Sequence, residues 1–349
     1  MKIGILTFPR AINYGAALQA AALQCVLQEQ GADASLIDYN CEAIARTSRI
    51  FDFKQILDAR YVIAHLGNLP LAVKRQKAFA SFWDSYLRFS NEKPEGFDAI
   101  VAGSDQVWNY KLTGDDWFYY LDFEKKSTKK VAYAASFGLS EIPQEKHAVL
   151  RPLLEDFDHL SVRENTAAKL VDQISGRQAQ VVLDPTLLLT KTQWAEMADP
   201  GFTQKNYIFV YTLFNSDSLW EFAYELSRKT GLPIRTVSYS RFHKREAEYS
   251  YTAGPAQWLS YMLNADYVVT NSFHGFAFSV NFQKQFYYEL PPHSSGVGSR
   301  LSDMAEAYGL VHRELSRADE KPIDYAPVQE KLAKARIASM DFIRGFIKD

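Results

Sequence analysis

Residues 265–287, ADYVVTNSFHGFAFSVNFQKQFY, predict a buried strand that passes through a short polar turn directly into a helix. Asn271, Ser272 and His274 lie in the turn, at the edge where an open α/β sheet binds its ligand. The helix is predicted to begin near Gly275, and its first N–H groups could hold an anion with His274 beside them as a donor or acid. The structural alternative is a helix cap around a buried imidazole.

Strands and helices alternate along both halves of the chain. Strands are predicted at residues 2–8, 34–38, 99–103, 130–135, 160–162, 180–183, 207–212, 234–238, 267–270 and 286–289. Helices are predicted at 16–30, across much of 51–90, and at 144–157, 165–174, 216–229, 254–265, 275–283 and 327–347. Because strands joined by helices need crossovers, both sheets are expected to be mostly parallel.

The length of 349 residues is more than one hydrophobic core usually holds, so two domains are expected. The polar stretch 191–204 predicts a linker between them. We therefore expect an N-terminal α/β domain over 1–190 and a C-terminal α/β domain over 191–320. An amphipathic helix within 321–349 is expected to pack back on the N-terminal domain. A ligand is expected in the cleft between the two domains.

The composition and charge exclude several classes of function. A net charge of -2 and the lack of a dense Lys or Arg block argue against nucleic acid as a partner. No apolar run reaches the roughly 18–20 residues of a membrane span, and the first strand is too short for a secretory signal. Cys25 and Cys41 look unpaired and lack CxxC spacing, which argues for a reducing compartment and against a zinc site. We expect a cytoplasmic protein.

No metal and no cofactor are predicted. His243, His293 and His312 are scattered without the spacing of metal ligands, and no Asp-x-Asp pair occurs in the loops after the predicted strands. The turn after the first strand lacks the three-glycine pattern of a dinucleotide site.

That turn nevertheless carries Asn13, Tyr14, Gly15 and Gln19, and it opens a helix. Gly15 permits a tight turn and Asn13 can cap the helix. The free N–H groups of the helix could receive a phosphate or carboxylate, whereas a plain strand–helix turn is the alternative.

A second polar block, Ser104, Asp105, Gln106, Trp108 and Asn109, follows the strand at 99–103. Trp108 offers a flat apolar face among hydrogen-bonding groups, which is the chemistry that binds a sugar. Asp105 is a candidate general base or hydroxyl acceptor. The alternative is an Asx turn with Trp108 in the core.

Two arginines are candidates to bind an anion. Arg163 ends the strand at 160–162, and Arg300 lies where a glycine-rich loop meets a helix. The planar guanidinium fork suits a carboxylate or phosphate. A surface Arg–Glu pair and a solvated helix start are the alternatives.

Six blocks follow one another in order between about residues 3 and 312. They are Asn13-Tyr14-Gly15-Ala16-x-x-Gln19, Gly103-Ser104-Asp105-Gln106-x-Trp108-Asn109, Ser161-Val162-Arg163-Glu164, Asp184-Pro185-Thr186, the run 265–275, and Ser299-Arg300. Together they resemble the polysaccharide pyruvyl transferase family. The resemblance implies a GT-B-like α/β fold, with two Rossmann-like domains whose mostly parallel sheets face a central cleft.

The resemblance also implies a reaction. A pyruvyl group is transferred from phosphoenolpyruvate to two hydroxyls of a sugar in a surface polysaccharide or its lipid-linked precursor, which forms a cyclic pyruvate ketal and releases phosphate. Arginines and helix N-termini should hold the donor's carboxylate and phosphate. An acid must protonate its methylene carbon, and a base must take the acceptor's hydroxyl proton.

We assign residues to these tasks. His274 is the acid or phosphate-contacting group, and Arg163 and Asp105 complete the catalytic set. The donor-binding residues are Asn271, Ser272, Gly275 and Arg300. The acceptor-binding residues are Asn13, Tyr14, Gly15, Gln19, Ser104, Gln106, Trp108 and Asn109.

One position departs from the family. Several members carry Arg-Leu-His where this chain has Ser272-Phe273-His274, so Arg300 is the candidate replacement and a different donor is the alternative. A GT-B glycosyltransferase using a sugar nucleotide and a non-catalytic polysaccharide-assembly protein are the competing functions. A lipid-linked acceptor would bring the chain to the inner face of the membrane as a peripheral protein.

Overall fold

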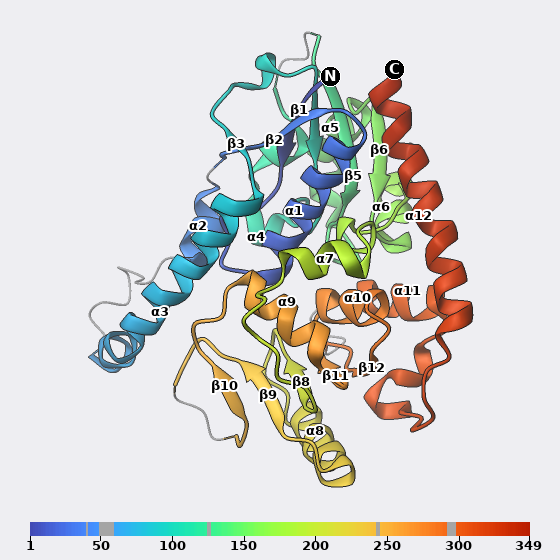
Figure 1. Cartoon of the computed structure of the whole chain (residues 1–349). Helices are drawn as coiled ribbons and strands as arrows, with labels where there is room; N and C mark the ends of the chain where they lie inside the picture. The colour runs from blue at the N-terminus through green and yellow to red at the C-terminus, as the bar shows by residue number, and fades with distance from the viewer. Residues whose placement is uncertain (40, 49–58, 124–126, 242–244, 292–297) are drawn as a thin grey trace.

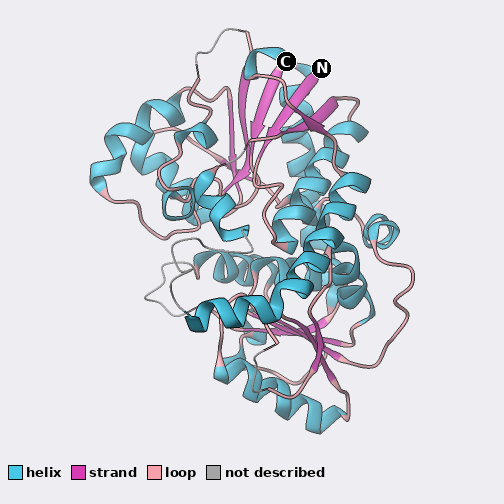
Figure 2. Cartoon of the chain, turned by 90° about the vertical axis from the view of Figure 1, so that its left-hand side faces the viewer, coloured by secondary structure: helices cyan, strands magenta, loops and turns pink. Residues whose placement is uncertain are grey.

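The computed structural model describes residues 1–39, 41–48, 59–123, 127–241, 245–291 and 298–349. It contains two parallel sheets, which Figure 2 shows as separate layers surrounded by helices. The first eight residues of the helical stretch predicted across 51–90 lie outside the described residues.

Seven strands form the first sheet, in the order β3-β2-β1-β4-β5-β6-β7. Neighbouring strands pair in parallel throughout, and Ile5 pairs with Leu36 on one side and Val101 on the other. The central strand β4 is apolar and buried along its whole length, as expected for a parallel sheet covered on both faces. The strands are β1 (Lys2–Leu6), β2 (Asp33–Ile37), β3 (Phe89–Ser90), β4 (Ala99–Ala102), β5 (Lys129–Ala135), β6 (His159–Val162) and β7 (Gln180–Val181).

Helices join these strands and cover the sheet (Figure 1). The alanine-rich α1 is buried along nearly all of its length, since small side chains let it pack against the sheet and against the second unit. The helices of this half are α1 (Tyr14–Glu29), α2 (Glu42–Ser48), α3 (Ala59–Tyr86), α4 (Tyr110–Thr113), α5 (Gln144–Glu155), α6 (Asn165–Ser175) and α7 (Lys191–Met197).

Five parallel strands form the second sheet, in the order β10-β9-β8-β11-β12. The strands are β8 (Ile208–Tyr211), β9 (Ile234–Val237), β10 (Glu248–Ser250), β11 (Tyr267–Thr270) and β12 (Gln285–Tyr288). The helices are α8 (Asp217–Thr230), α9 (Pro255–Asn264), α10 (Phe273–Asn281), α11 (Ser299–Tyr308) and α12 (Tyr325–Lys348). The predicted class, two α/β units with parallel sheets, is confirmed.

The long helix α12 runs along the first sheet to its far end, where the two termini lie close together (Figure 1). The Oγ of Ser339 accepts from the backbone N–H of Leu183 at 2.9 Å, just beyond β7. Arg336 donates to the backbone oxygen of Leu187 at 2.6 Å and to Asn281 on α10 at 2.9 Å. The helix therefore joins both units. The domain boundaries at 190 and 320 stay a prediction.

Part of the predicted linker is structured. Residues 191–197 form α7, which begins with a capping box between Thr190 and Gln193. Trp194 is fully buried and donates from its indole N–H to the backbone oxygen of Thr186 at 3.1 Å. The start of the predicted linker is therefore helical, because a capping box and one buried tryptophan suffice to fix a short helix here.

Candidate active site

The polar residues that matter lie after the carboxyl ends of strands in both sheets. Ser104 and Asp105 follow β4, Arg163 follows β6, and Asp184 lies beyond β7. In the second unit His274 lies in the first turn of α10, after β11. The parallel strands bring these ends to one edge of each sheet, and the two edges meet.

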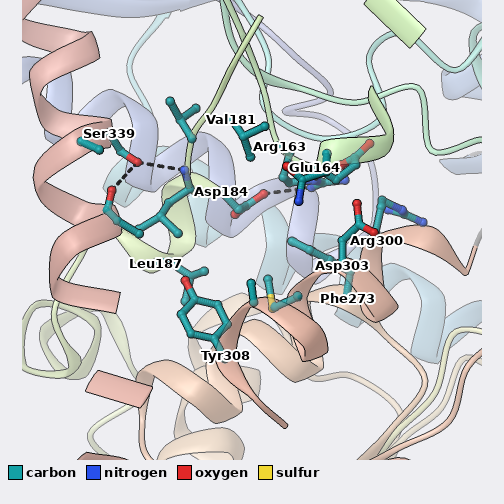
Figure 3. A pocket seen from close by; sticks show the side chains of 17 residues that line it. Arg163, Glu164, Val181, Asp184, Leu187, Phe273, Arg300, Asp303, Tyr308 and Ser339 are labelled. Atoms are coloured by element: carbon teal, nitrogen blue, oxygen red, sulfur yellow. Dashed lines mark hydrogen bonds and ion pairs between the residues drawn. The ribbon is translucent and has the colours of Figure 1, made fainter. Parts of the chain in front are cut away.

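Asp184 is the centre of this cluster. Its Oδ2 accepts from Ser104 Oγ and from Arg163 Nη1, each at 2.9 Å, and lies 3.8 Å from His274 Nε2. Its Oδ1 accepts from the N–H and hydroxyl of Thr186 at 3.0 and 2.7 Å. Figure 3 shows Asp184 directed toward Arg163. The sequence pointed to Asp184 only as part of a block, and an aspartate after a strand and before a proline was the signal available.

The charges around Asp184 decide its ionisation. Burial by itself would raise the pKa of this carboxyl. His274, which is protonated at the low pH where this carboxyl titrates, the charge of Arg163, and the hydrogen bonds from Thr186 and Arg163 outweigh burial and lower the pKa to about 2. Asp184 is therefore a buried carboxylate at neutral pH.

Arg163 is almost wholly enclosed, with a side chain only 1% exposed. Its guanidinium lies 3.7 Å from Asp105 and 3.6 Å from Glu164, and its Cζ is 4.2 Å from the ring centre of Phe273. Burial opposes its charge, yet Asp184, Asp105 and Glu164 together raise its pKa. Its Nε and Nη2 have no hydrogen-bond partner. Arg163 is therefore a permanently charged group with two nitrogen donors that make no hydrogen bond.

Arg300, on α11, is a second buried cation beside the same ring. It is 8% exposed, and its Cζ lies 6.0 Å from the ring centre of Phe273. Burial first, and then repulsion from Arg163, lower its pKa to about 10, against the opposing pull of nearby carboxylates. Its Nε also lacks a hydrogen-bond partner. Two guanidiniums with unpaired donors on one aromatic ring suit an anion with two charged groups.

His274 is packed against Gly15 of the first unit. A Cβ at position 15 would lie 2.1 Å from His274 Nδ1, so only glycine fits there. Burial above all lowers the pKa of His274, with Arg163 and Arg300 acting in the same direction against Asp184 and Asp105. The imidazole is therefore neutral at pH 7, and its buried Nε2 has no hydrogen-bond partner.

The predicted anion cradle at the start of α10 is largely used by the protein itself. Ser272 caps the helix by accepting from the N–H of Gly275 at 3.3 Å, and Gly275 packs tightly on Thr270. Asn271 accepts from the N–H of Leu213 at 2.8 Å and donates to a neighbouring carbonyl. The prediction that these groups hold the donor is corrected in one respect, because the N–H of Gly275 is already occupied.

Trp108 does not face a ligand. It is fully buried, its ring stacks on Tyr120, and its indole N–H donates to the backbone oxygen of Tyr119 at 3.2 Å. The prediction that it binds the acceptor is wrong, since no face of the ring is left for a sugar. Asn109 caps α4 and donates to Gln106 at 2.8 Å, so this pair maintains the loop.

The turn before α1 is likewise tied into the structure. Asn13 caps the helix by accepting from Ala16 at 3.1 Å, and Tyr14 donates to the backbone oxygen of Ala253 at 3.1 Å. Gln19 is fully buried and donates to Thr7 at 2.8 Å, which in turn donates to the backbone oxygen of Ser104. Of the predicted acceptor residues, the structure therefore brings Gly15 and Ser104 into the cluster.

A cavity of about 170 Å³ adjoins the cluster between the two units (Figure 3). Arg163, Glu164, Asp184 and Arg300 form part of its wall, and His274 is not among the side chains that line it. The rest of the wall is mainly apolar and comes from β7, α11 and α12, including Val181, Leu187, Met304, Ala307, Ala335 and Ala338. Glu164, which lines this cavity, was not assigned a role from the sequence.

Two further features concern metals and membranes. In the parts of the chain that the structure describes, no three or more His, Cys, Asp or Glu side chains are grouped as metal ligands. His243 and His293 lie outside the described residues. Within the same described ranges, each helix is either too short or too polar to cross a bilayer.

Fold and site together define a two-unit α/β protein with buried cationic groups where the strand ends of its two sheets meet. The family model for polysaccharide pyruvyl transferase matches residues 13–288. The chain belongs to this family. None of the curated protein sequences compared with the chain matches it.

Several solved structures are distantly similar. The UDP-GlcNAc 2-epimerase of Methanocaldococcus jannaschii, in complex with UDP-GlcNAc and UDP, is 12% identical over 98% of this chain and 93% of its own, with a TM-score of 0.46. The Neisseria meningitidis UDP-GlcNAc 2-epimerase bound to UDP-GlcNAc is 10% identical over 97% and 100%, with a TM-score of 0.41. The E. coli heptosyltransferase WaaC with ADP is 12% identical over 86% and 90%, with a TM-score of 0.39.

Proposed function

We propose that this protein is an enzyme that transfers a pyruvyl group from phosphoenolpyruvate to two hydroxyls of one sugar. The sugar belongs to a surface polysaccharide or to its lipid-linked precursor. The product is a cyclic pyruvate ketal, and phosphate is released. Membership of the pyruvyl transferase family supports the reaction class.

One observation carries the choice of donor. Arg163 Nε and Nη2, Arg300 Nε and His274 Nε2 are all buried without a hydrogen-bond partner. Leaving buried donors unpaired is unfavourable by about 1–3 kcal/mol each, so a ligand that accepts from them gains affinity. Phosphoenolpyruvate carries a carboxylate and a phosphate, which match the two guanidiniums and the imidazole.

The proposed roles follow from position. Arg163 and Arg300 hold the donor's anionic groups, and Arg300 replaces the arginine that the family carries at the position of Ser272. Its place beside Phe273, the next residue in the chain, supports this replacement. His274 lies in the first turn of α10 and its Nε2 has no hydrogen-bond partner, so we assign it to contact the phosphate. Asp105 accepts the proton of the acceptor hydroxyl.

A direct assay tests this function. The protein is mixed with phosphoenolpyruvate and a panel of galactose- and mannose-containing oligosaccharides, and phosphate release and the mass of the sugar product are measured. We expect phosphate release with a pyruvyl mass added to one sugar. His274→Ala should abolish turnover, whereas His312→Ala, an exposed histidine elsewhere, should not.

Two results would contradict the proposal. One is the absence of phosphate release across the whole panel. The other is a rise in thermal stability with nucleotide sugars but none with phosphoenolpyruvate, because a ligand stabilises the folded state by RT ln(1 + [L]/Kd). That outcome would favour the glycosyltransferase alternative.

A further inference from the structure

Glu164 is a buried carboxyl group with one oxygen held and the other unpartnered. The residue is 4% exposed and follows Arg163 at the end of β6. Its Oε1 accepts from the hydroxyl of Ser136 at 2.6 Å. Its Oε2 has no hydrogen-bond donor, although Arg163 Nε lies 3.6 Å away. Although Glu164 occupies the N-cap position of α6, its side chain makes no capping hydrogen bond. The carboxyl group is thus held in place by Ser136 and has one oxygen to spare.

The carboxyl group belongs to the charged part of the cavity wall. Figure 3 shows Glu164 beside Arg163 on one side of the cavity, with Val181, Leu187 and Tyr308 across from them. The volume of about 170 Å³ is sufficient for a ligand of a few carbon atoms. A small molecule with an anionic and an apolar part fits this division of the wall.

The charged groups around Glu164 come from three segments of the chain. Arg163 lies beside it at the end of β6, Arg300 and Asp303 are on α11, and Asp184 lines the same cavity. Burial raises the pKa of Glu164, and Asp303 adds to this, while Arg163, the Ser136 hydrogen bond and Arg300 oppose it. Asp303 itself accepts from the N–H and hydroxyl of Thr166 at 3.2 and 3.3 Å, so it is already partnered.

Phosphoenolpyruvate has the two parts that the cavity would receive. Its carboxylate needs cations, and its methylene carbon is apolar and must gain a proton before C2 can be attacked. His274 does not line this cavity, and its Nε2 lies 3.8 Å from Asp184 Oδ2. We propose, on the basis of the proposed function above, that Glu164 is the acid that protonates the donor's methylene carbon, while His274 serves the phosphate.

The protons balance in this scheme. The π electrons of the C2–C3 bond take the proton of Glu164 and form a C–H bond, which makes C3 a methyl group and leaves C2 an oxocarbenium centre. The first acceptor hydroxyl adds to C2 and gives its proton to Asp105. The bond from C2 to the phosphate oxygen then breaks, the second hydroxyl adds, and its proton leaves with the phosphate through His274. The proton on Asp105 returns through solvent to Glu164.

Donor binding in the absence of an acceptor tests whether Glu164 becomes protonated. An anion beside Glu164 favours its protonated form, so binding of phosphoenolpyruvate by the whole protein near pH 8 should take up about one proton. Titration calorimetry in Tris and in HEPES measures this uptake as a buffer-dependent binding enthalpy. Glu164→Gln should bind the donor with that uptake abolished, and Asp303→Asn, which removes a partnered carboxylate of the same cavity, should retain it.

Turnover gives the second readout. Glu164→Gln keeps the shape and the Ser136 contact but has no acidic proton, so its kcat should fall roughly 10²- to 10⁴-fold while donor affinity is kept. In the natural protein kcat should fall at high pH, where Glu164 loses its proton. Glu164→Asp should recover part of the activity and should show part of this pH dependence. The proposal is overturned if Glu164→Gln takes up the same proton or turns over within about threefold of the natural protein. If the natural protein binds no phosphoenolpyruvate, the proposed donor is wrong. This result differs from a failure of the Glu164 proposal alone, because no binding heat would then appear with any variant.

Discussion

Arg163 and Arg300 pack beside the same phenylalanine ring, yet the protein partners them differently. Arg163 has the carboxylates of Asp184, Glu164 and Asp105 at 2.9, 3.6 and 3.7 Å. Within the described ranges no carboxylate lies at ion-pair distance from Arg300, although its side chain is nearly as deeply buried. Burial of a cation without a partner is unfavourable, so the two residues must contribute in different ways to the folded state.

The difference separates holding the fold from binding a ligand. Arg163 neutralises carboxylates that would otherwise be buried unpaired, and therefore the folded state depends on it. Arg300 forms no ion pair with a carboxylate of the described residues, so its charge is available to an anionic ligand. Substitution of Arg163 should therefore lower the stability most, whereas substitution of Arg300 should lower donor affinity with little loss of stability.

Arg163→Met should have the largest effect on stability. The change leaves Asp184 and Glu164 without their cation in a buried site, so the free energy of unfolding should fall by about 3–5 kcal/mol. Urea unfolding followed by circular dichroism measures the change. Arg163→Lys keeps a positive charge but loses the fork, and it should recover only part of the loss. An unchanged midpoint for Arg163→Met would mean that the carboxylates are satisfied by their other partners.

Asp184→Asn should have the next largest effect, about 2–4 kcal/mol at pH 7. The pKa of Asp184 is about 2 in the folded protein, below the value near 3.9 of an unfolded aspartate, so its ionised form stabilises the folded state. This contribution is complete above the unfolded pKa and is lost as the pH falls toward 2. The stability difference between the natural protein and Asp184→Asn should therefore narrow between about pH 4 and 2, as measured by urea titrations at several pH values. If the stability difference does not change with pH, the charge of Asp184 does not contribute to the stability of the folded state.

The alternation of strands and helices along the chain, and the polar residues that follow several strands, could be predicted from the sequence because both follow from local patterns. The strands expected at 99–103 and 267–270 are found at Ala99–Ala102 and Tyr267–Thr270. The short edge strands β3 and β10 were not predicted, since two or three residues carry no period. Arg163 and His274 were singled out because they end or follow buried strands.

Distances between segments could not be predicted in this way. Asp184 bonds Ser104, which lies 80 residues earlier in the chain, and nothing in the local pattern of either residue reveals the partner. Trp108 is a second example, because the local sequence of a polar loop does not show whether its aromatic residue faces a ligand or, as here, stacks on Tyr120 in the core. Both cases depend on packing between elements, which a single sequence does not encode in any short window.

Arg300→Met should have the smallest effect on stability, and it gives the sharpest test of the comparison. Methionine keeps the volume beside Phe273 and removes a buried charge that has no ion-pair partner among the described residues, so the free energy of unfolding should change by less than about 1 kcal/mol. Donor affinity should fall roughly ten- to hundredfold, because a hydrogen bond to a charged group contributes about 1.5–3 kcal/mol. Calorimetric titration with phosphoenolpyruvate measures the affinity, and urea unfolding of the same sample measures the stability. If Arg300→Met unfolds as easily as Arg163→Met, both arginines serve the fold and the distinction fails. If it binds the donor as tightly as the natural protein, then Arg300 does not replace the arginine that Ser272 lacks, and Arg163 alone holds the donor's charges.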